Sequence, residues 1–139
     1  MTFVKDYQFG SKYEQLFAEI MEFKNFNIAT KKQSTHDILD EDTNLTYEVK
    51  ADRLAFKTGN ICIEYMCSDK LSGINTSKSN FYAYFIERND KTHVLYVIPT
   101  EEIRNKIKDK LYIKDMKGGD GWRSRFYLFK LSVFEEFKR

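Results

Sequence analysis

The chain has 139 residues, and 23 Lys and Arg residues against 21 Asp and Glu residues give it a formal net charge of +2. This length predicts one compact domain over residues 1–139, with little room for a second. A content of 42% hydrophobic and 32% charged residues, with a single Pro, excludes a disordered or collagen-like chain.

The cysteines and the apolar runs predict the cellular setting. Cys62 and Cys67 have no second Cys or His cluster at metal-ligand spacing, which disfavours a zinc site and a disulfide framework. The longest strongly apolar run, residues 94–98, is far shorter than the roughly 18 residues of a membrane span. Residues 1–9 lack the apolar core of a signal peptide. We therefore expect a soluble, cytoplasmic protein without a membrane partner.

The first expected elements are a helix and a β-hairpin. Ser11 and Glu14 form an S-x-x-E capping box, and apolar residues at helical spacing predict a helix over residues 11–23. A segment rich in Asp and Asn then separates two runs typical of strands. These runs predict a hairpin with strands 34–39 and 45–52 around the turn 40–44.

The rest of the chain alternates further strands with helices. Residues 68–80 are expected to hold a short helix, and Thr100 is expected to cap a helix over residues 101–110. The glycine-rich residues 118–121 predict a flexible loop, and a short helix is expected at the end of the chain. The remaining expected strands are residues 60–66, 81–87, 93–98 and 125–131. This order predicts an α/β fold with a central mixed β-sheet flanked by helices.

Side chains that suit phosphodiester chemistry gather around the predicted hairpin. Alternation over residues 45–52 places Glu48 and Lys50 on one face of the second strand. The hairpin carries Asp37 toward the same end of the sheet. Two carboxylates beside a lysine indicate metal-assisted hydrolysis of a phosphodiester.

The expected cofactor is Mg²⁺, for which Mn²⁺ can substitute. Mg²⁺ prefers carboxylate oxygens and retains waters, so we expect Asp37, Glu48 and the backbone carbonyl of Val49 to hold it. The ion would polarise the phosphorus centre and lower the pKa of a water molecule. Lys50 is expected to orient the nucleophile or to offset charge that develops in the transition state.

These residues resemble the PD-(D/E)XK nuclease superfamily. Asp37 stands at the first Asp of the motif, residues 48–50 match E-x-K, and His36 replaces the Pro. The opening residues 10–14 resemble archaeal-type Holliday junction resolvases, whose first helix offers a Glu, and by that resemblance Glu14 is a fourth catalytic candidate. Similarity to small phage-encoded nucleases extends to the segments at residues 58–60, 63–64, 72–74 and 118–121.

The resemblance implies a single nuclease domain with a restriction-endonuclease-like core. It implies a Mg²⁺-dependent DNA endonuclease, structure-specific and active on Holliday junctions in recombination. Such resolvases cut two strands symmetrically, so a homodimer is expected. The protein would be cytoplasmic, or virus-encoded and active in the host cell. Polar residues expected at the surface offer contacts to DNA phosphates: Lys70, Ser72, Lys78, Arg123 and Arg125.

Several of these assignments have alternatives. Glu14 is equally explained by the capping box, and Asp40 or Asp42 would replace Asp37 under a different strand register. The E-x-K pair also suits an ordinary exposed strand face. Alternative functions are a nicking, restriction-like or end-processing nuclease of the same fold, and a non-catalytic nucleic-acid-binding module. Solvent-facing roles are expected for Asp52 and Glu64.

Overall fold

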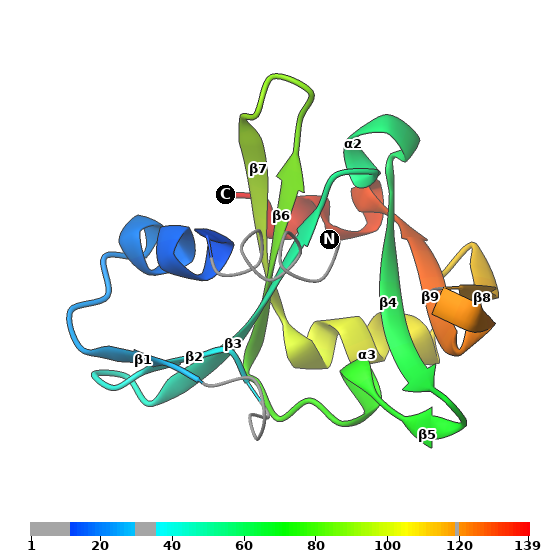
Figure 1. Cartoon of the computed structure of the whole chain (residues 1–139), viewed down its shortest axis with the longest axis horizontal. Coiled ribbons are helices and arrows are strands. Elements are labelled where there is room, and N and C mark those ends of the chain that lie inside the picture. The colour runs from blue at the N-terminus through cyan, green and yellow to red at the C-terminus, as the bar shows by residue number, and fades with distance from the viewer. Residues whose placement is uncertain (1–11, 30–35, 119) are drawn as a thin grey trace.

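The computed structural model describes residues 12–29, 36–118 and 120–139. Two β-sheets share a core, and helices pack around them (Figure 1). The central sheet is mixed, with parallel and antiparallel neighbours. The predicted α/β class with a mixed sheet flanked by helices is therefore confirmed.

The larger sheet has five strands. Their bounds are β1 Phe26–Ile28, β2 Ile38–Asp40, β3 Leu45–Asp52, β6 Phe81–Glu87 and β7 His93–Pro99. The order across the sheet is β1-β2-β3-β6-β7. Strands β3 and β6 are parallel, and the other neighbours are antiparallel. Because parallel strands need a crossover connection, the chain leaves this sheet after β3 and returns at β6.

The crossover supplies half of the smaller sheet. Its strands are β4 Asn60–Cys67, β5 Lys70–Leu71, β8 Lys114–Gly118 and β9 Ser124–Lys130. They follow the order β5-β4-β9-β8, and every neighbouring pair is antiparallel. In Figure 1 this sheet lies to the right of the larger one.

Helices cover both faces of the larger sheet. Residues 12–20 are helical, and the other elements are α2 Ala55–Thr58, α3 Thr100–Lys108 and three 3₁₀ helices, η1 Gly73–Asn75, η2 Asp120–Trp122 and η3 Leu131–Phe137. The helix over residues 12–20 packs on one face through Tyr13 and Phe17. Elements α3 and η3 join the core on the other face through Ile103 and Phe134.

Alternation along the strands separates two hydrophobic cores. On one face, Tyr47 of β3 and Phe85 of β6 pack with the helix over residues 12–20. On the other, Tyr82 and Tyr84 of β6 pack against the smaller sheet. The aromatic residues of β6 are thus mostly core. Glu48 alternates with Tyr47, so it lies on the face that meets the smaller sheet.

Several element boundaries differ from the predicted ones. The predicted helix over residues 11–23 ends at residue 20, where Glu22 adopts a left-handed φ of 57° and the Phe23 N–H donates to the Ala18 carbonyl. Ser11, the predicted cap of that helix, lies outside the described residues, as do residues 34 and 35. The first hairpin strand is described as a strand only from Ile38.

The predicted cap of α3 is wrong. Thr100 is the first residue of the helix, Pro99 takes the N-cap position, and no side chain caps the helix. The Thr100 hydroxyl is buried and without a hydrogen-bond partner within the described residues. Pro suits this boundary because it has no N–H to leave unpaired.

Strands β1, β5 and β8 and helix α2 do not appear among the expected elements. At the predicted flexible loop, Gly118 ends β8 and residues 120–122 form η2. Within the described residues, no helix is both long and apolar enough to cross a membrane.

Candidate active site

Asp37 and Glu48 come together through the pairing of β2 with β3. The register pairs Ile38 with Tyr47, so Asp37 lies opposite Glu48. The Asp37 N–H donates to the Tyr47 carbonyl at 2.9 Å, and the Val49 N–H donates to Asp37 Oδ2 at 2.8 Å. A side-chain hydrogen bond joins the two carboxyl groups, which requires a proton on one of them.

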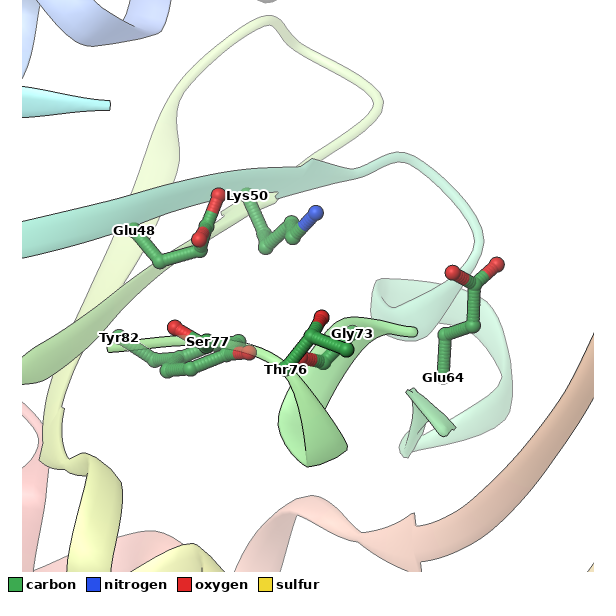
Figure 2. Close-up of a pocket in the computed structure, with 7 residues that line it drawn as sticks. All are labelled: Glu48, Lys50, Glu64, Gly73, Thr76, Ser77 and Tyr82. Atoms are coloured by element: carbon green, nitrogen blue, oxygen red, sulfur yellow. The ribbon is translucent and has the colours of Figure 1, made fainter. Parts of the chain in front are cut away.

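Glu48 and Lys50 open onto a cavity of about 350 Å³, which we call the β3 cavity. In Figure 2 both side chains project from β3 toward the segment that carries Thr76 and Ser77, and Lys50 lies between Glu48 and Glu64 in this view. The cavity is lined by Glu48, Lys50, Glu64, Gly73, Thr76, Ser77 and Tyr82. Both sheets and the η1 segment thus contribute to one hollow.

The acidity of Glu48 differs strongly from that of a free side chain. Burial is the largest cause that raises its pKa, and the charge of Asp37 raises it further, while Lys50 lowers it. The result is a pKa of about 8 for Glu48. A cation beside the two carboxyl groups would favour the ionised form of both.

Ser77 connects the walls of the β3 cavity. Its side chain is hydrogen-bonded to the Glu48 carboxyl and to the Tyr82 hydroxyl, and its Oγ accepts the Ser79 N–H at 3.2 Å. Burial of Tyr82 raises the pKa of its hydroxyl to about 12, so Tyr82 is a neutral hydrogen-bonding group near pH 7. Ser77 therefore holds Glu48 against β6.

Gly73 and Arg104 position the segment that carries Ser77 and forms one wall of the β3 cavity. Gly73 has a φ of +51°, and a Cβ built on it would lie 2.1 Å from the Glu64 carbonyl oxygen. From α3, Arg104 Nη2 donates to the carbonyls of Ile74 at 3.2 Å and Ser77 at 2.8 Å. Only a residue without a side chain permits this close approach of η1 to β4.

The carboxyl pair of Glu48, in the lining of the β3 cavity, and Asp37, beside it, suits Mg²⁺. Within the part of the chain that the structure describes, no three His, Cys, Asp or Glu side chains form a metal-binding group. Mg²⁺ is commonly held by one or two carboxylates, with substrate phosphate and water as the other ligands. Asp37 and Glu48 offer such a pair. The Val49 N–H fixes Asp37, and a ligand role for the Val49 carbonyl stays a prediction.

Glu14 is buried but is not one of the residues that line the β3 cavity. Its neighbours Tyr13 and Phe17 pack in the core on the opposite face of the larger sheet, and the Tyr13 hydroxyl donates to Glu87 Oε2 at 2.5 Å. The catalytic role of Glu14 stays a prediction that these contacts do not favour.

The alternatives to Asp37 have structural partners in the turn. Asp40 is 5% exposed and accepts the Thr43 hydroxyl at 2.7 Å and the Asp42 N–H at 3.2 Å. Asp42 accepts the side-chain amide of Asn25 at 3.0 Å. Both carboxylates stabilise the turn between β2 and β3, which leaves Asp37 as the one next to Glu48.

Asp52 and Glu64 also differ from the expectation of a purely solvent-facing role. Asp52 Oδ1 accepts the N–H groups of Leu54 at 2.7 Å and Ala55 at 2.9 Å, so it holds the turn that leads from β3 into α2. Glu64 lines the β3 cavity, where its Oε2 accepts the Ser72 hydroxyl at 2.9 Å. Sequence reasoning underrated Glu64 because its approach depends on the close contact with η1.

The predicted DNA contacts are spread over several elements. Lys70 in β5, Lys78 before β6 and Arg123 before β9 are exposed. Ser72 instead donates to Glu64 in the β3 cavity. Arg125 lies in β9 and is half-buried.

Arg125 has protein partners that fix its orientation. Its Nε donates to the Tyr65 hydroxyl at 2.8 Å, and its Nη2 lies 3.5 Å from Asp115 Oδ1. The Tyr65 hydroxyl in turn donates to Asp115 at 2.6 Å. The carboxylate partly offsets the charge that Arg125 was expected to offer to phosphate.

Comparison of the chain with models of known protein families, and with curated proteins, gives no match.

Proposed function

We propose that the chain is a Mg²⁺-dependent phosphodiesterase that cuts DNA, of the PD-(D/E)XK kind. The observation that carries this proposal is the direct contact of the Asp37 carboxyl group with that of Glu48, which lines the β3 cavity together with Lys50. A half-buried acid pair is unfavourable without a cation, and a phosphate with its metal ion supplies both the cation and an anion for the lysine.

Four residues at the β3 cavity have a defined task in this proposal. Asp37 and Glu48 would hold the ion, which when bound polarises a phosphate oxygen. Lys50 orients the attacking water or stabilises negative charge that develops on the phosphate. Ser77 restrains the Glu48 carboxyl by its hydrogen bond. Preorganisation of this kind lowers the barrier because little reorientation is needed at the moment of reaction.

The proposed substrate is branched DNA, in the manner of a Holliday junction resolvase. Support comes from the resemblance of residues 37 and 48–50 to the nuclease motif and from exposed Lys70, Lys78 and Arg123. A homodimer would present two such sites to a four-way junction. The reaction would take place in the cytoplasm, on the DNA of the cell or of a virus within it.

The test is cleavage by the purified full chain with Mg²⁺, Mn²⁺, Ca²⁺ or EDTA. The substrates are a four-way junction, a matched linear duplex, a flap and a single strand. We expect Mg²⁺- or Mn²⁺-dependent cleavage that is fastest on the junction. Faster cleavage of another substrate would indicate a nicking or end-processing nuclease instead of a resolvase. DNA binding without cleavage in the presence of any of these metal ions would refute the proposed nuclease activity.

A variant pair connects any cleavage to the β3 cavity. Glu48→Gln removes a proposed ligand and keeps the size of the side chain, whereas Glu19→Gln changes an exposed carboxylate on the helix over residues 12–20. Loss of cleavage in the first variant alone supports the site. Equal rates in both variants would place the chemistry elsewhere.

A further inference from the structure

A second cavity lies on the smaller sheet, beside the turn that joins β8 to β9. We call it the β8–β9 cavity, and its volume is about 280 Å³. Strand β4 borders both cavities, with Glu64 in the first and Met66 in the second. The β8–β9 cavity is lined by Met66, Ser68, Asp69, Lys117, Gly121, Trp122, Arg123 and Arg125.

The turn presents a tryptophan to solvent. Trp122 is the single Trp of the chain, and 71% of its surface is exposed. Its backbone φ of 58° lies in the left-handed region, which is unfavourable for a residue with a Cβ. Large aromatic side chains are usually buried. An exposed indole in a strained turn indicates a contact outside the chain.

Cationic side chains line the same cavity as Trp122. Arg123 follows Trp122 and is exposed, and a Cβ built on Gly121 would lie 3.4 Å from Arg123 Nε. This is an ordinary contact distance, and it is the φ of +67° that favours glycine at this position. Lys117 is also exposed, and among the described residues neither Lys117 nor Arg123 forms an ion pair.

The charge of the β8–β9 cavity favours an anion. Lys117 and Arg125 are direct cross-strand partners, and like charges at such positions destabilise a sheet. Asp115 offsets part of the Arg125 charge at 3.5 Å. The lining contains one carboxylate, Asp69, against three cations. A bound phosphate would relieve the repulsion between Lys117 and Arg125.

We propose that the β8–β9 cavity binds an unpaired nucleotide of DNA. The Trp122 indole stacks on the base, and Lys117 and Arg123 bind the adjoining phosphates. A paired base does not offer its face in this way, because it is stacked within the duplex. The inference rests on the proposed function, since it specifies the DNA substrate as one with unpaired nucleotides.

The single tryptophan makes the contact directly measurable. The full chain in EDTA is titrated with oligo-dT, a blunt duplex, oligo-U and inorganic phosphate, and the fluorescence of Trp122 is followed. We expect oligo-dT to quench the fluorescence, with no quenching by the duplex or by phosphate. Absence of quenching by oligo-dT, equal quenching by the duplex, or quenching by oligo-U alone would overturn the proposal.

Variants separate stacking from charge. Binding of labelled oligo-dT, measured by anisotropy, should weaken by about 5- to 150-fold in Trp122→Ala, the range for loss of one base–aromatic stack. Trp122→Phe should retain part of the affinity. Leu111→Ala, at a position 50% exposed outside the cavity, is the matched control and should bind normally. Equal affinity of Trp122→Ala and the wild type would refute the site.

A second set of variants tests whether Lys117 and Arg123 bind phosphates. Lys117→Ala and Arg123→Ala should each reduce the salt dependence of oligo-dT binding, by about 0.7 in the log–log slope for a single strand. Lys114→Ala, on the same strand outside the cavity, should leave the slope unchanged. Circular dichroism melting confirms that each variant is folded. An unchanged slope in Lys117→Ala and Arg123→Ala would overturn their role.

Cleavage measured in parallel keeps the two proposals distinct. If oligo-dT quenches Trp122 but no metal ion supports cleavage, the proposed binding site is supported and the proposed nuclease activity is refuted. If the protein cuts DNA but oligo-dT does not quench Trp122, the nuclease activity is supported and the proposed binding site is refuted.

Discussion

The β3 cavity and the β8–β9 cavity are built from side chains that are held in opposite ways. In the β3 cavity, Glu48 is hydrogen-bonded on two sides, and α3 anchors the wall that carries Ser77. In the β8–β9 cavity, Trp122 and Arg123 extend into solvent from a turn. A backbone hydrogen bond from the Ser68 N–H to the Arg123 carbonyl, at 2.9 Å, ties that turn to the residue that follows β4.

The fold restrains its polar groups in the β3 cavity and leaves those of the β8–β9 cavity accessible. Chemistry needs reacting groups held within a fraction of an ångström, and the half-buried carboxyl pair has that support. Binding of a flexible strand needs accessible rings and charges, and the turn supplies them. The proposals therefore assign catalysis to the restrained cavity and DNA capture to the exposed one.

The largest effect is expected from Gly73→Ala, which breaks the restrained cavity. The new Cβ meets the Glu64 carbonyl at 2.1 Å in a left-handed residue, so the free energy of unfolding should fall by about 3 kcal/mol. Gly59→Ala is the matched control, because Gly59 has a φ of +73° but nothing within 4 Å of its Cβ position. It should cost only about 1 kcal/mol. Urea unfolding measures both, and equal losses would contradict the close contact.

Lys50→Ala tests the chemistry of the same cavity without removing a structural bond. Single-turnover cleavage of pre-bound DNA should slow by on the order of 10²-fold, the loss typical of one preorganised electrostatic contact. Folding and DNA affinity should stay close to those of the wild type. Lys130→Ala, at an exposed lysine of β9, is the control and should cut normally. A wild-type rate for Lys50→Ala would remove Lys50 from the site.

Glu48→Gln tests whether the buried Glu48 carboxyl group makes the stability of the protein depend on pH. The pKa of Glu48 is raised to about 8 in the folded chain, above its ordinary 4.5, so between these values the folded state binds more protons than the unfolded state. Stability of the metal-free wild type should therefore fall as pH rises from about 4.5 to 8.

Glu48→Gln should lose that decline, and Mg²⁺ should restore stability to the wild type at pH 8. Urea unfolding at pH 5 and pH 8 in EDTA measures the difference, with Glu19→Gln as the control. The same pH dependence in Glu48→Gln and the wild type would contradict the raised pKa.

The smallest effect is expected from Arg104→Met, which loosens the wall of the β3 cavity. Loss of the bonds to the Ile74 and Ser77 carbonyls should lower stability by about 1 kcal/mol and slow cleavage, with oligo-dT binding unchanged. Glu101→Gln removes only the exposed ion pair of Arg104 at 3.4 Å and should change stability by less than about 0.5 kcal/mol. A larger loss in Glu101→Gln would reverse this ranking.

Much of the fold follows from local sequence signals. The turn between β2 and β3 is predictable because Asp40 and Thr43 supply its hydrogen bonds, and β6 and β7 are predictable from their aromatic and β-branched runs. Strand β8 is not, since residues 114–118 are mostly polar and pair only because β9 offers an open edge. The choice of β9 rather than β3 as the partner of β4 is also a tertiary event.

The same limit applies to the candidate site. The juxtaposition of Asp37 with Glu48 follows from a hairpin whose turn can be recognised in the sequence. Glu64 and Ser77 line the β3 cavity only because η1 contacts β4. The only sequence signal for that contact is the Ser-Gly dipeptide at residues 72–73. The capture of Arg125 by Tyr65 and Asp115 depends on the register of three strands, which no local pattern encodes.

The parallel pairing of β3 with β6 has a consequence for the order of folding. The hairpins β2–β3 and β6–β7 close over short stretches of chain, whereas Tyr47 and Phe81 pair across the whole crossover. Contacts between distant residues form late because loop closure must precede them. Glu48 and Ser77 thus meet only after the crossover has docked, so we expect a nascent or partly folded chain to lack a competent β3 cavity.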